Sequence, residues 1–330
     1  MLLLSSYGLR TLRSTVAGRI TRRFLNRILF EGEEVQEQGG GLVAHLPAED
    51  FRAKHINTIL KLELGANLRC GVADRGMTDR ATLLSRAEDG GLSVSLGLAT
   101  DLFCNDRPGV DLLLCVPRPQ KMERLLPIVA CLGVGRLYLV EAAKVQKDYF
   151  GSHLFRKPSA MRALLLEGLM QAEVDCQVPQ VTIVRSHEFR RFLEGGGDFL
   201  EGGDGDGDES LLRVVAHPQL IESGGGGNGV GAPDSACEGG EGGAEVAVLG
   251  DSIKFSQFMR QVGIGTGKEV VGTEARRRIV VAVGPEGGWE RAEVVALRGR
   301  GFQLVDLGPR ILRTDIAVPV LLGLAHEFLD

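Results

Sequence analysis

The sequence has no apolar run long enough to cross a lipid bilayer, so we expect no transmembrane helix and no membrane partner. None of its six cysteines stands at Cys-x-x-Cys spacing, and no histidine cluster accompanies them, so the pattern predicts neither a metal site nor a disulfide framework. A reducing compartment is then the default. Cys115 and Cys131 lie in apolar stretches, where we expect small buried hydrophobic residues.

Phosphate-binding loops are also missing. The segment Gly263–Lys268 resembles a Walker loop only superficially, because position 262 is Val and Glu269 follows Lys268. No Gly-x-Gly-x-x-Gly follows a predicted strand, which argues against dinucleotide binding. A nucleotide hydrolase therefore has no support in the sequence.

Acidic residues are scarce outside one region. The net charge is -5, but Asp and Glu crowd into residues 194–245, which hold a single arginine, Arg213. The remainder is net positive, so a nucleic-acid partner is compatible with the composition. The Gly-rich insertions in this region predict tolerated surface loops, with a regulatory tail as the alternative. Leu211–Pro218 is the exception and predicts a core strand.

The first 30 residues contain no Asp or Glu but six arginines, which are Arg10, Arg13, Arg19, Arg22, Arg23 and Arg27. This composition is typical of an organelle transit peptide, which we place at residues 1–21, for a mitochondrion or chloroplast. The alternatives are a disordered basic N-terminus or a basic arm that contacts RNA, and a cytoplasmic location.

Two patterns follow one another along the chain. From about residue 42 to 103, short apolar runs broken by Gly, Asp and Asn predict a small β-barrel-like domain with one short helix at 55–62. From residue 111, predicted strands at 112–116, 137–140 and 181–184 alternate with predicted helices at 121–132 and 158–172. This alternation predicts an α/β domain with a mostly parallel sheet.

The C-terminal stretch holds two strand, Gly-rich loop and helix units. A strand at 279–283 leads into Gly284–Trp289 and a helix at 290–297, and a strand at 303–307 leads into Gly308–Asp315 and a helix at 316–329. Ligands bind at the carboxyl ends of strands in such sheets. We therefore expect a small-molecule site there, with Arg313 beside it to meet an anionic or electron-rich substrate.

The loop sequences Val283–Gly288 and Leu307–Asp315 together resemble the two signature loops of the RsmE family. These are bacterial-type 16S ribosomal RNA uridine-N3 methyltransferases of the SPOUT class. Weaker likenesses occur at Arg22-Arg23-Phe24, His55–Gly65, Lys121–Val134 and His217-Pro218, so the resemblance covers about residues 22–330 without the insertion. The chain departs from the family at Gln171–Asp175, where a Glu-Gln-x-Gly-Arg motif is lost, and at Asp315, where Glu is usual. The first departure bears on the RNA target and on activity; the second keeps the charge.

The resemblance implies a PUA-like β-barrel at residues 22–104 and a SPOUT domain with a deep trefoil knot at 105–330. It implies a homodimer that binds S-adenosyl-L-methionine and acts on small-subunit ribosomal RNA. Residues implied to bind the cofactor are Val283, Gly284, Pro285, Glu286, Gly287, Gly288, Leu307, Gly308, Ile311, Leu312 and His217.

Three residues are candidates for catalysis. Arg313 would stabilise charge on the uracil oxygens or clamp a phosphate, and Glu286 or Asp315 would accept the N3 proton. The alternative is that both carboxylates only cap helix N-termini. Arg22, Arg23 and His55 would contact RNA. Two other functions stay open: a SPOUT enzyme with a different RNA target, and a non-catalytic RNA-binding protein of ribosome assembly.

Overall fold

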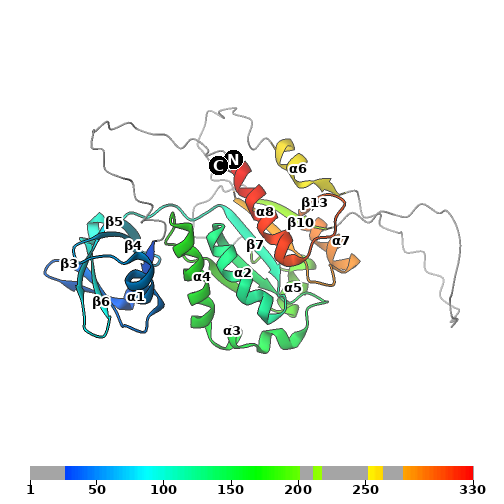
Figure 1. The fold of residues 1–330 in the computed structure, drawn as a ribbon. Helices are drawn as coiled ribbons and strands as arrows, with labels where there is room; N and C mark the ends of the chain where they lie inside the picture. The colour runs from blue at the N-terminus through cyan, green and yellow to red at the C-terminus, as the bar shows by residue number, and fades with distance from the viewer. Residues whose placement is uncertain (1–26, 201–210, 218–251, 263–277, 330) are drawn as a thin grey trace, which may run out of the picture.

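The computed structural model describes residues 27–200, 211–217, 252–262 and 278–329. The expected transit peptide, Arg22, Arg23 and the loop Gly263–Lys268 lie outside these ranges. The described chain forms two separate sheets, one before residue 98 and one after residue 109 (Figure 1).

The first sheet is curled and has the strand order β1-β4-β5-β6-β3-β2. All of its pairs are antiparallel except β1 with β4. Its strands are β1 (Ile28–Phe30), β2 (Val35–Gln38), β3 (Gly41–Leu46), β4 (Asn67–Val72), β5 (Gly76–Arg86) and β6 (Leu92–Gly97). In β6 buried and more exposed residues alternate, so one face packs on the small core and the other meets solvent.

A short helix covers this sheet. The predicted helix at 55–62 begins earlier, as α1 (Phe51–His55), and continues as a π-helical turn at Ile56–Leu60. Asp50 explains the earlier start, since its carboxylate accepts a hydrogen bond from the Arg52 amide and caps the first turn.

The second sheet has the order β11-β13-β10-β12-β7-β8-β9, and every pair of neighbours is parallel. This confirms the predicted α/β class with a mostly parallel sheet. Its strands are β7 (Val110–Cys115), β8 (Val134–Val140), β9 (Gln180–Val184), β10 (Leu211–Ala216), β11 (Ile253–Lys254), β12 (Arg278–Val283) and β13 (Gln303–Asp306).

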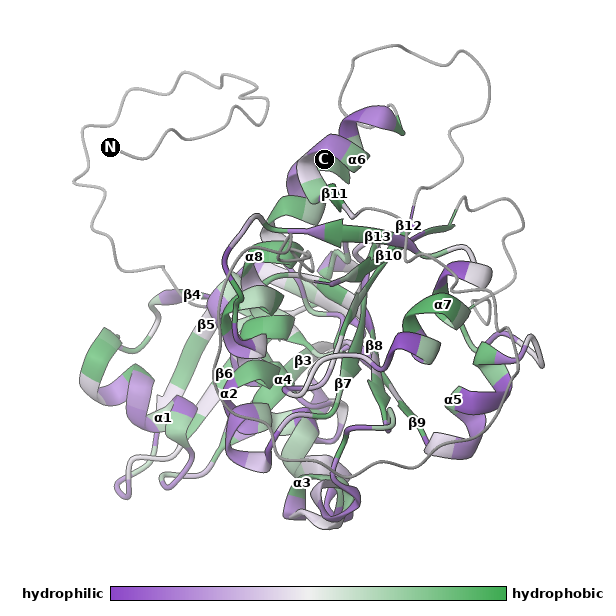
Figure 2. Ribbon diagram, turned by 90° about the vertical axis from the view of Figure 1, so that its right-hand side faces the viewer, coloured by the Kyte–Doolittle hydropathy of each residue, from purple (hydrophilic) through white to green (hydrophobic). Residues whose placement is uncertain are grey.

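Helices cover both faces of the second sheet (Figures 1 and 2). Three pack on one face: α2 (Pro119–Cys131), α4 (Pro158–Ala172) and α8 (Thr314–Leu329). Two lie on the other: α5 (Ser186–Leu193) and α7 (Arg291–Gly299). Two more helices, α3 (His153–Arg156) and α6 (Phe255–Gln261), complete the set in the described residues. Since both faces are covered, β7 and β12 are buried at every residue, as parallel strands require.

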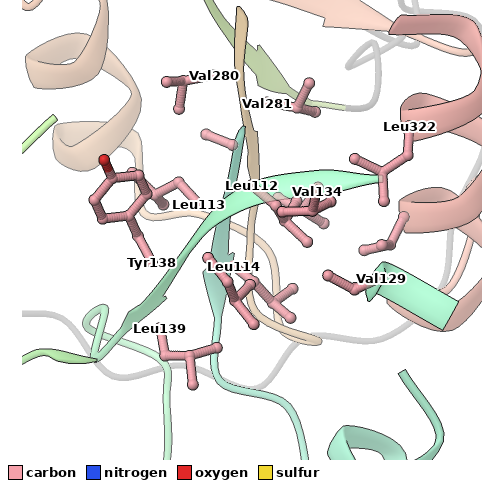
Figure 3. Packing of buried hydrophobic residues seen from close by; sticks show 14 of the residues in the cluster. Leu112, Leu113, Leu114, Val129, Val134, Tyr138, Leu139, Val280, Val281 and Leu322 are labelled. Carbon is pink, nitrogen blue, oxygen red and sulfur yellow. The ribbon is translucent and has the colours of Figure 1, made fainter. Parts of the chain in front are cut away.

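The main core lies between these layers. Leu112 of β7 and Val281 of β12 point to the side of the sheet where Val129 of α2 and Leu322 of α8 lie, whereas Leu113 and Val280 point to the opposite side (Figure 3). α2 and α4 pack closely because Gly168 presents no side chain, and a Cβ built there would lie 2.0 Å from the carbonyl oxygen of Pro127. No helix in the described part of the chain is long and apolar enough to cross a membrane.

Two expectations were wrong. Cys115 is buried as predicted, but Cys131 is exposed, because it lies on the solvent side of the last turn of α2. The low-complexity region does not begin at residue 194 either. Asp198 pairs with Arg213 (2.7 Å) and Arg300 (3.1 Å), and Leu200 is fully buried, so this part belongs to the folded domain. The apolar pair Phe199-Leu200 was masked in the sequence by its glycine and acidic neighbours.

Candidate cofactor site

Three loops leave the same edge of the second sheet. β12 and β13 are the two parallel neighbours of β10 (Figure 2). Ala216 at the end of β10 is in register with Val283 of β12 and Val305 of β13. The segments that follow these strands therefore begin side by side. His217 is held there, since its amide donates to the carbonyl of Val305 (3.0 Å). The structure thus brings together the two predicted Gly-rich loops and His217.

The loop after β12 is a tight turn. The amide of Gly288 donates to the carbonyl of Pro285 (2.8 Å), and Gly288 has φ +71, a conformation that favours glycine. Gly284 lies against Trp289, and a Cβ built on it would be 2.8 Å from the indole Nε1. Trp289 is buried and packs near Phe189, with ring centroids 6.2 Å apart. Loop backbone and indole are therefore in direct contact.

Two cations at the start of α2, Lys121 in its first turn and Arg118 directly before it, reach this loop. Glu286 pairs with Lys121 (Nζ to Oε1, 2.8 Å) and with Arg118 (Nε to Oε2, 3.3 Å). The alternative that Glu286 caps a helix is wrong, because α7 begins at Arg291 and its first turn uses Glu293, whose carboxylate accepts from the Glu290 amide. The ion pairs form because β7 runs beside β12, so the N-terminus of α2 opens at the same sheet edge.

The loop after β13 leads into α8. The amide of Gly308, which has φ +103, donates to the Asp306 carboxylate (2.8 Å) and fixes the start of the loop. The carbonyl of Arg313 accepts hydrogen bonds from the amides of Ile316 (2.9 Å) and Ala317 (2.8 Å), which closes the first turn of α8. Ile311, near the middle of the loop, is 85% exposed.

Arg313 and Asp315 form an ion pair of 3.0 Å at the start of α8. The arginine side chain is 69% exposed, and it contacts only the Oδ2 atom of the carboxylate. The Oδ1 atom is buried and has no hydrogen-bond partner among the described residues. Asp315 lies in the first turn of α8, so its position also fits the expected interaction with the helix N-terminus.

The predicted site residues fall into three groups. Most lie on the three converging loops or directly beside them, with Val283 at the end of β12 and Asp315 in the first turn of α8: Val283, Gly284, Pro285, Glu286, Gly287, Gly288, Leu307, Gly308, Ile311, Leu312, Arg313, Asp315 and His217. His55 ends α1 in the other domain, and Arg22 and Arg23 lie outside the described residues. Their roles stay predictions.

Sequence reasoning missed four residues at this site, which are Trp289, Arg118, Lys121 and Lys144. The Nζ atom of Lys144 donates to the carbonyl of Gly287 (3.3 Å). Trp289 had a signal, since it is the single tryptophan of the chain and directly follows the glycines. The cations had none, because only the strand order shows that they lie beside Glu286.

The geometry suits S-adenosylmethionine. The indole Nε1 of Trp289 and Oδ1 of Asp315 are buried without hydrogen-bond partners among the described residues, and both border the loops. Unpartnered buried donors and acceptors are rare unless a ligand completes them. The indole of Trp289 lies buried behind Gly284 and supports the loop, so backbone amides are the donors available at this sheet edge. Amide donors near a buried carboxylate oxygen suit a ligand with several polar groups.

A family model described as an RNA methyltransferase domain matches residues 259–326, the stretch that contains both loops. Among curated proteins, the ribosomal RNA small subunit methyltransferase E of Treponema pallidum is 26% identical over 308 residues, which are 92% of this chain and 93% of the relative. The Synechocystis protein of the same name is 45% identical over a shorter stretch of 53 residues, or 16% of this chain and 18% of the relative.

Solved structures share the fold. A ribosomal RNA small subunit methyltransferase E from Neisseria gonorrhoeae, bound to S-adenosylmethionine, matches with a TM-score of 0.54 at 19% identity and covers 92% of this chain and 96% of its own. A Legionella pneumophila protein with bound S-adenosylmethionine matches with a TM-score of 0.57 at 17% identity, over 92% of this chain and 98% of its own. The two loops lie within the part of the chain that matches the RNA methyltransferase domain, and along nearly its whole length the chain is similar to the ribosomal RNA small subunit methyltransferase E of Treponema pallidum.

Proposed function

We propose that this chain transfers the methyl group of S-adenosylmethionine to N3 of a uridine in small-subunit ribosomal RNA. The observation that carries the proposal is the convergence of both Gly-rich loops and His217 at one edge of the parallel sheet. The names of the curated relatives support the substrate class, and the bound ligand of two structural relatives supports the cofactor.

The cofactor, when bound, supplies an electrophilic methyl group on a sulfonium ion. The backbone amides of the two loops would hold it by hydrogen bonds, apart from those of Gly288 and Gly308, which already donate to Pro285 and Asp306. Trp289 is buried behind Gly284 and supports the first loop from the inside. Lys144 and the Glu286 ion pairs keep the first loop in place, so the binding surface is formed before the ligand arrives.

Uridine N3 becomes nucleophilic when it loses its imino proton. Asp315 suits the task of proton acceptor, because one carboxylate oxygen is engaged by Arg313 and the other has no partner among the described residues. Glu286 suits it less, because both of its carboxylate oxygens are already engaged, one by Lys121 and the other by Arg118. Arg313, exposed beside Asp315, would stabilise the negative charge that develops on the uracil oxygens.

RNA would enter over a rim of positive charge. Arg118 (67% exposed) and Arg313 (69% exposed) stand at the same sheet edge and can meet phosphates. The curled N-terminal sheet would add further RNA contacts, with His55 and the basic residues Arg22 and Arg23.

A homodimer fits the outer face of two neighbouring helices. Ile128 of α2 and Ile316 and Val320 of α8 expose apolar side chains, and α2 packs against α8. Sedimentation of the wild type beside Val320→Glu tests this proposal, which expects a dimer for the first and a monomer for the second.

The trefoil knot and the domain limits stay predictions, because the chain between β10 and β12 includes ranges outside the described residues.

A non-catalytic RNA-binding role is the second candidate. One observation favours it: the segment that replaces the family motif is used in packing, where Glu173 pairs with Arg69 and accepts a bond from Arg27 on its carbonyl oxygen (2.7 Å). Methyl transfer distinguishes the two functions, since only the enzyme gives a methylated product.

We also propose that residues 1–21 direct the protein to an organelle, on the basis of their arginine-rich, acid-free composition. A fluorescent fusion of the full chain should enter a mitochondrion or chloroplast, and deletion of residues 1–21 should leave it in the cytosol. Cytosolic fluorescence of the full-length fusion would contradict the proposal.

The proposed function is tested by incubating the protein with labelled S-adenosylmethionine and small-subunit ribosomal RNA that lacks modifications. Digestion to nucleosides should place the label in 3-methyluridine. Label in another nucleoside would indicate a different RNA target, and cofactor binding without any labelled RNA would favour the non-catalytic role.

A further inference from the structure

Two thiols face each other where the curled sheet meets the parallel sheet. Cys104 lies in the linker between β6 and β7, and Cys176 lies in the segment between α4 and β9. Their Sγ atoms are 3.7 Å apart although 72 positions separate them in the sequence. Neither residue belongs to the cofactor loops.

The two segments that carry these thiols are tied to each other by neighbouring contacts. The amide nitrogen Nε2 of Gln177 donates to the carbonyl of Asn105 (2.6 Å) and to Cys104 Sγ (3.3 Å). The side chain of Asn105 donates in turn to the carbonyl of Val174 (2.6 Å). These bonds join the linker that carries Cys104 to the segment that carries Cys176, and they hold the two sulfur atoms near each other.

The thiols differ in access to solvent. Cys104 is exposed, whereas Cys176 is fully buried. Burial, together with the adjacent Cys104 thiol and the carboxylates of Asp175 and Asp74, raises the pKa of Cys176 above its usual range. Cys104 is therefore the thiol that an oxidant in solution meets first, and Cys176 is placed to react with it afterwards.

We propose that Cys104 and Cys176 are a redox pair that forms a reversible disulfide when the protein meets a hydroperoxide. The Cys104 thiolate attacks the peroxide, its O–O bond breaks, and Cys104 becomes a sulfenic acid while an alcohol or water leaves. The Cys176 thiol then attacks the sulfenic sulfur, the S–O bond breaks, and water leaves as the S–S bond forms. Two thiols lose two electrons and two protons in total, and one peroxide is reduced.

The disulfide needs only a small movement. An S–S bond is about 2.0 Å long, so the sulfurs must approach by roughly 1.7 Å from their present 3.7 Å, within reach of side-chain rotation in the exposed linker. Transient disulfides of this kind are those expected in compartments that normally keep thiols reduced.

The bond would stiffen the junction of the two sheets. The carbonyl of Cys176 accepts a hydrogen bond from the amide of Asp74 (2.8 Å), in the turn between β4 and β5. The Asp74 carboxylate accepts one from the Val178 amide (2.8 Å) and pairs with Arg162 of α4 (2.9 Å). A link from Cys104 to Cys176 would therefore clamp the linker onto the segment that holds the curled sheet.

The test treats the reduced full-length protein with hydrogen peroxide in small excess, followed by intact mass measurement and non-reducing peptide mapping. We expect loss of two hydrogen atoms, a cross-linked Cys104–Cys176 peptide, and full reversal by dithiothreitol. The oxidised protein should melt several degrees higher than the reduced one, because a long closed loop restricts the unfolded chain.

Two variants complete the design. Cys104→Ser changes an exposed residue, so its fold is expected to be kept, and it should abolish both the cross-link and the rise in melting temperature. Cys131→Ser removes another exposed thiol and should leave both unchanged. Oxidation of Cys104 to sulfinic or sulfonic acid without the cross-link, or a cross-link to a different cysteine, would overturn the proposal.

Discussion

Replacing Gly284 by alanine gives the sharpest test of the loop after β12. The new Cβ would lie 2.8 to 3.0 Å from the Nε1, Cδ1 and Cε2 atoms of Trp289. Since ordinary contacts start near 3.4 Å, either the indole or the loop must move by about 0.5 Å. Trp289 is buried against Phe189, so the indole cannot swing freely. Overpacking of this kind costs about 2 kcal/mol, which corresponds to a fall in melting temperature of about 6 °C.

The affinity for S-adenosylmethionine should fall as well, because the displaced loop carries the amides proposed to bind it. If displacement of the loop costs the bound state about 1.4 kcal/mol of binding free energy, the affinity falls about tenfold. Thermal melting and calorimetry measure the two effects. Gly299→Ala is the matched control, because a Cβ there meets nothing within 4 Å, and it should bind and melt like the wild type. If Gly284→Ala matches this control in both assays, the assigned packing of the loop on Trp289 is wrong.

Three further predictions concern packing, charge and chemistry. Gly168→Ala should destabilise the fold by about 3 kcal/mol in urea denaturation, because its Cβ would lie 2.0 Å from the Pro127 carbonyl oxygen. The control Gly323→Ala, whose Cβ would meet nothing within 4 Å, should be neutral or stabilising. Equal stabilities of the two variants would refute the close approach of α2 and α4. Burial raises the pKa of Asp175 to about 6, an effect that Arg107 only partly opposes, so the folded state holds this proton more tightly than the unfolded state. The stability that protonated Asp175 contributes is present below about pH 4 and is lost as pH rises to about 6. Asp175→Asn should therefore be more stable than the wild type by up to about 2 kcal/mol at pH 7, and its free energy of unfolding should change less between pH 4 and 6. A variant that is less stable than the wild type at pH 7 would contradict the assignment. Arg313→Ala should lower methyl transfer at least 100-fold with little change in affinity for S-adenosylmethionine, and an unchanged transfer rate would remove Arg313 from the mechanism.

Much of the second sheet followed from sequence periodicity. The strands around Leu112 and Val280 are buried on both faces. A short, continuously apolar run of this kind is typical of a strand in a covered parallel sheet, so the sequence pattern was sufficient to predict them. The helix at 158–172 was predicted with its exact limits, because Pro158 marks its first turn. Short elements such as β1 and α3 were missed, since three or four residues carry too little pattern to be detected.

The candidate site was predicted in part. Glycines and the strand pattern identified both loops, because a sheet edge and a flexible backbone have clear local signals. The partners of Glu286 could not be found, because Lys121 and Arg118 are far from it in sequence and reach it only through the pairing of β7 with β12. The burial of Asp315 Oδ1 likewise depends on the packing of α8 and has no signal in the sequence.

The central claim is that these loops form a site for S-adenosylmethionine, and isothermal titration of the full-length wild-type protein tests it most directly. We predict one binding site per chain, with an affinity that Gly284→Ala weakens about tenfold and Gly299→Ala leaves unchanged. A wild-type protein that is folded by thermal melting but releases no binding heat at any temperature would contradict the account.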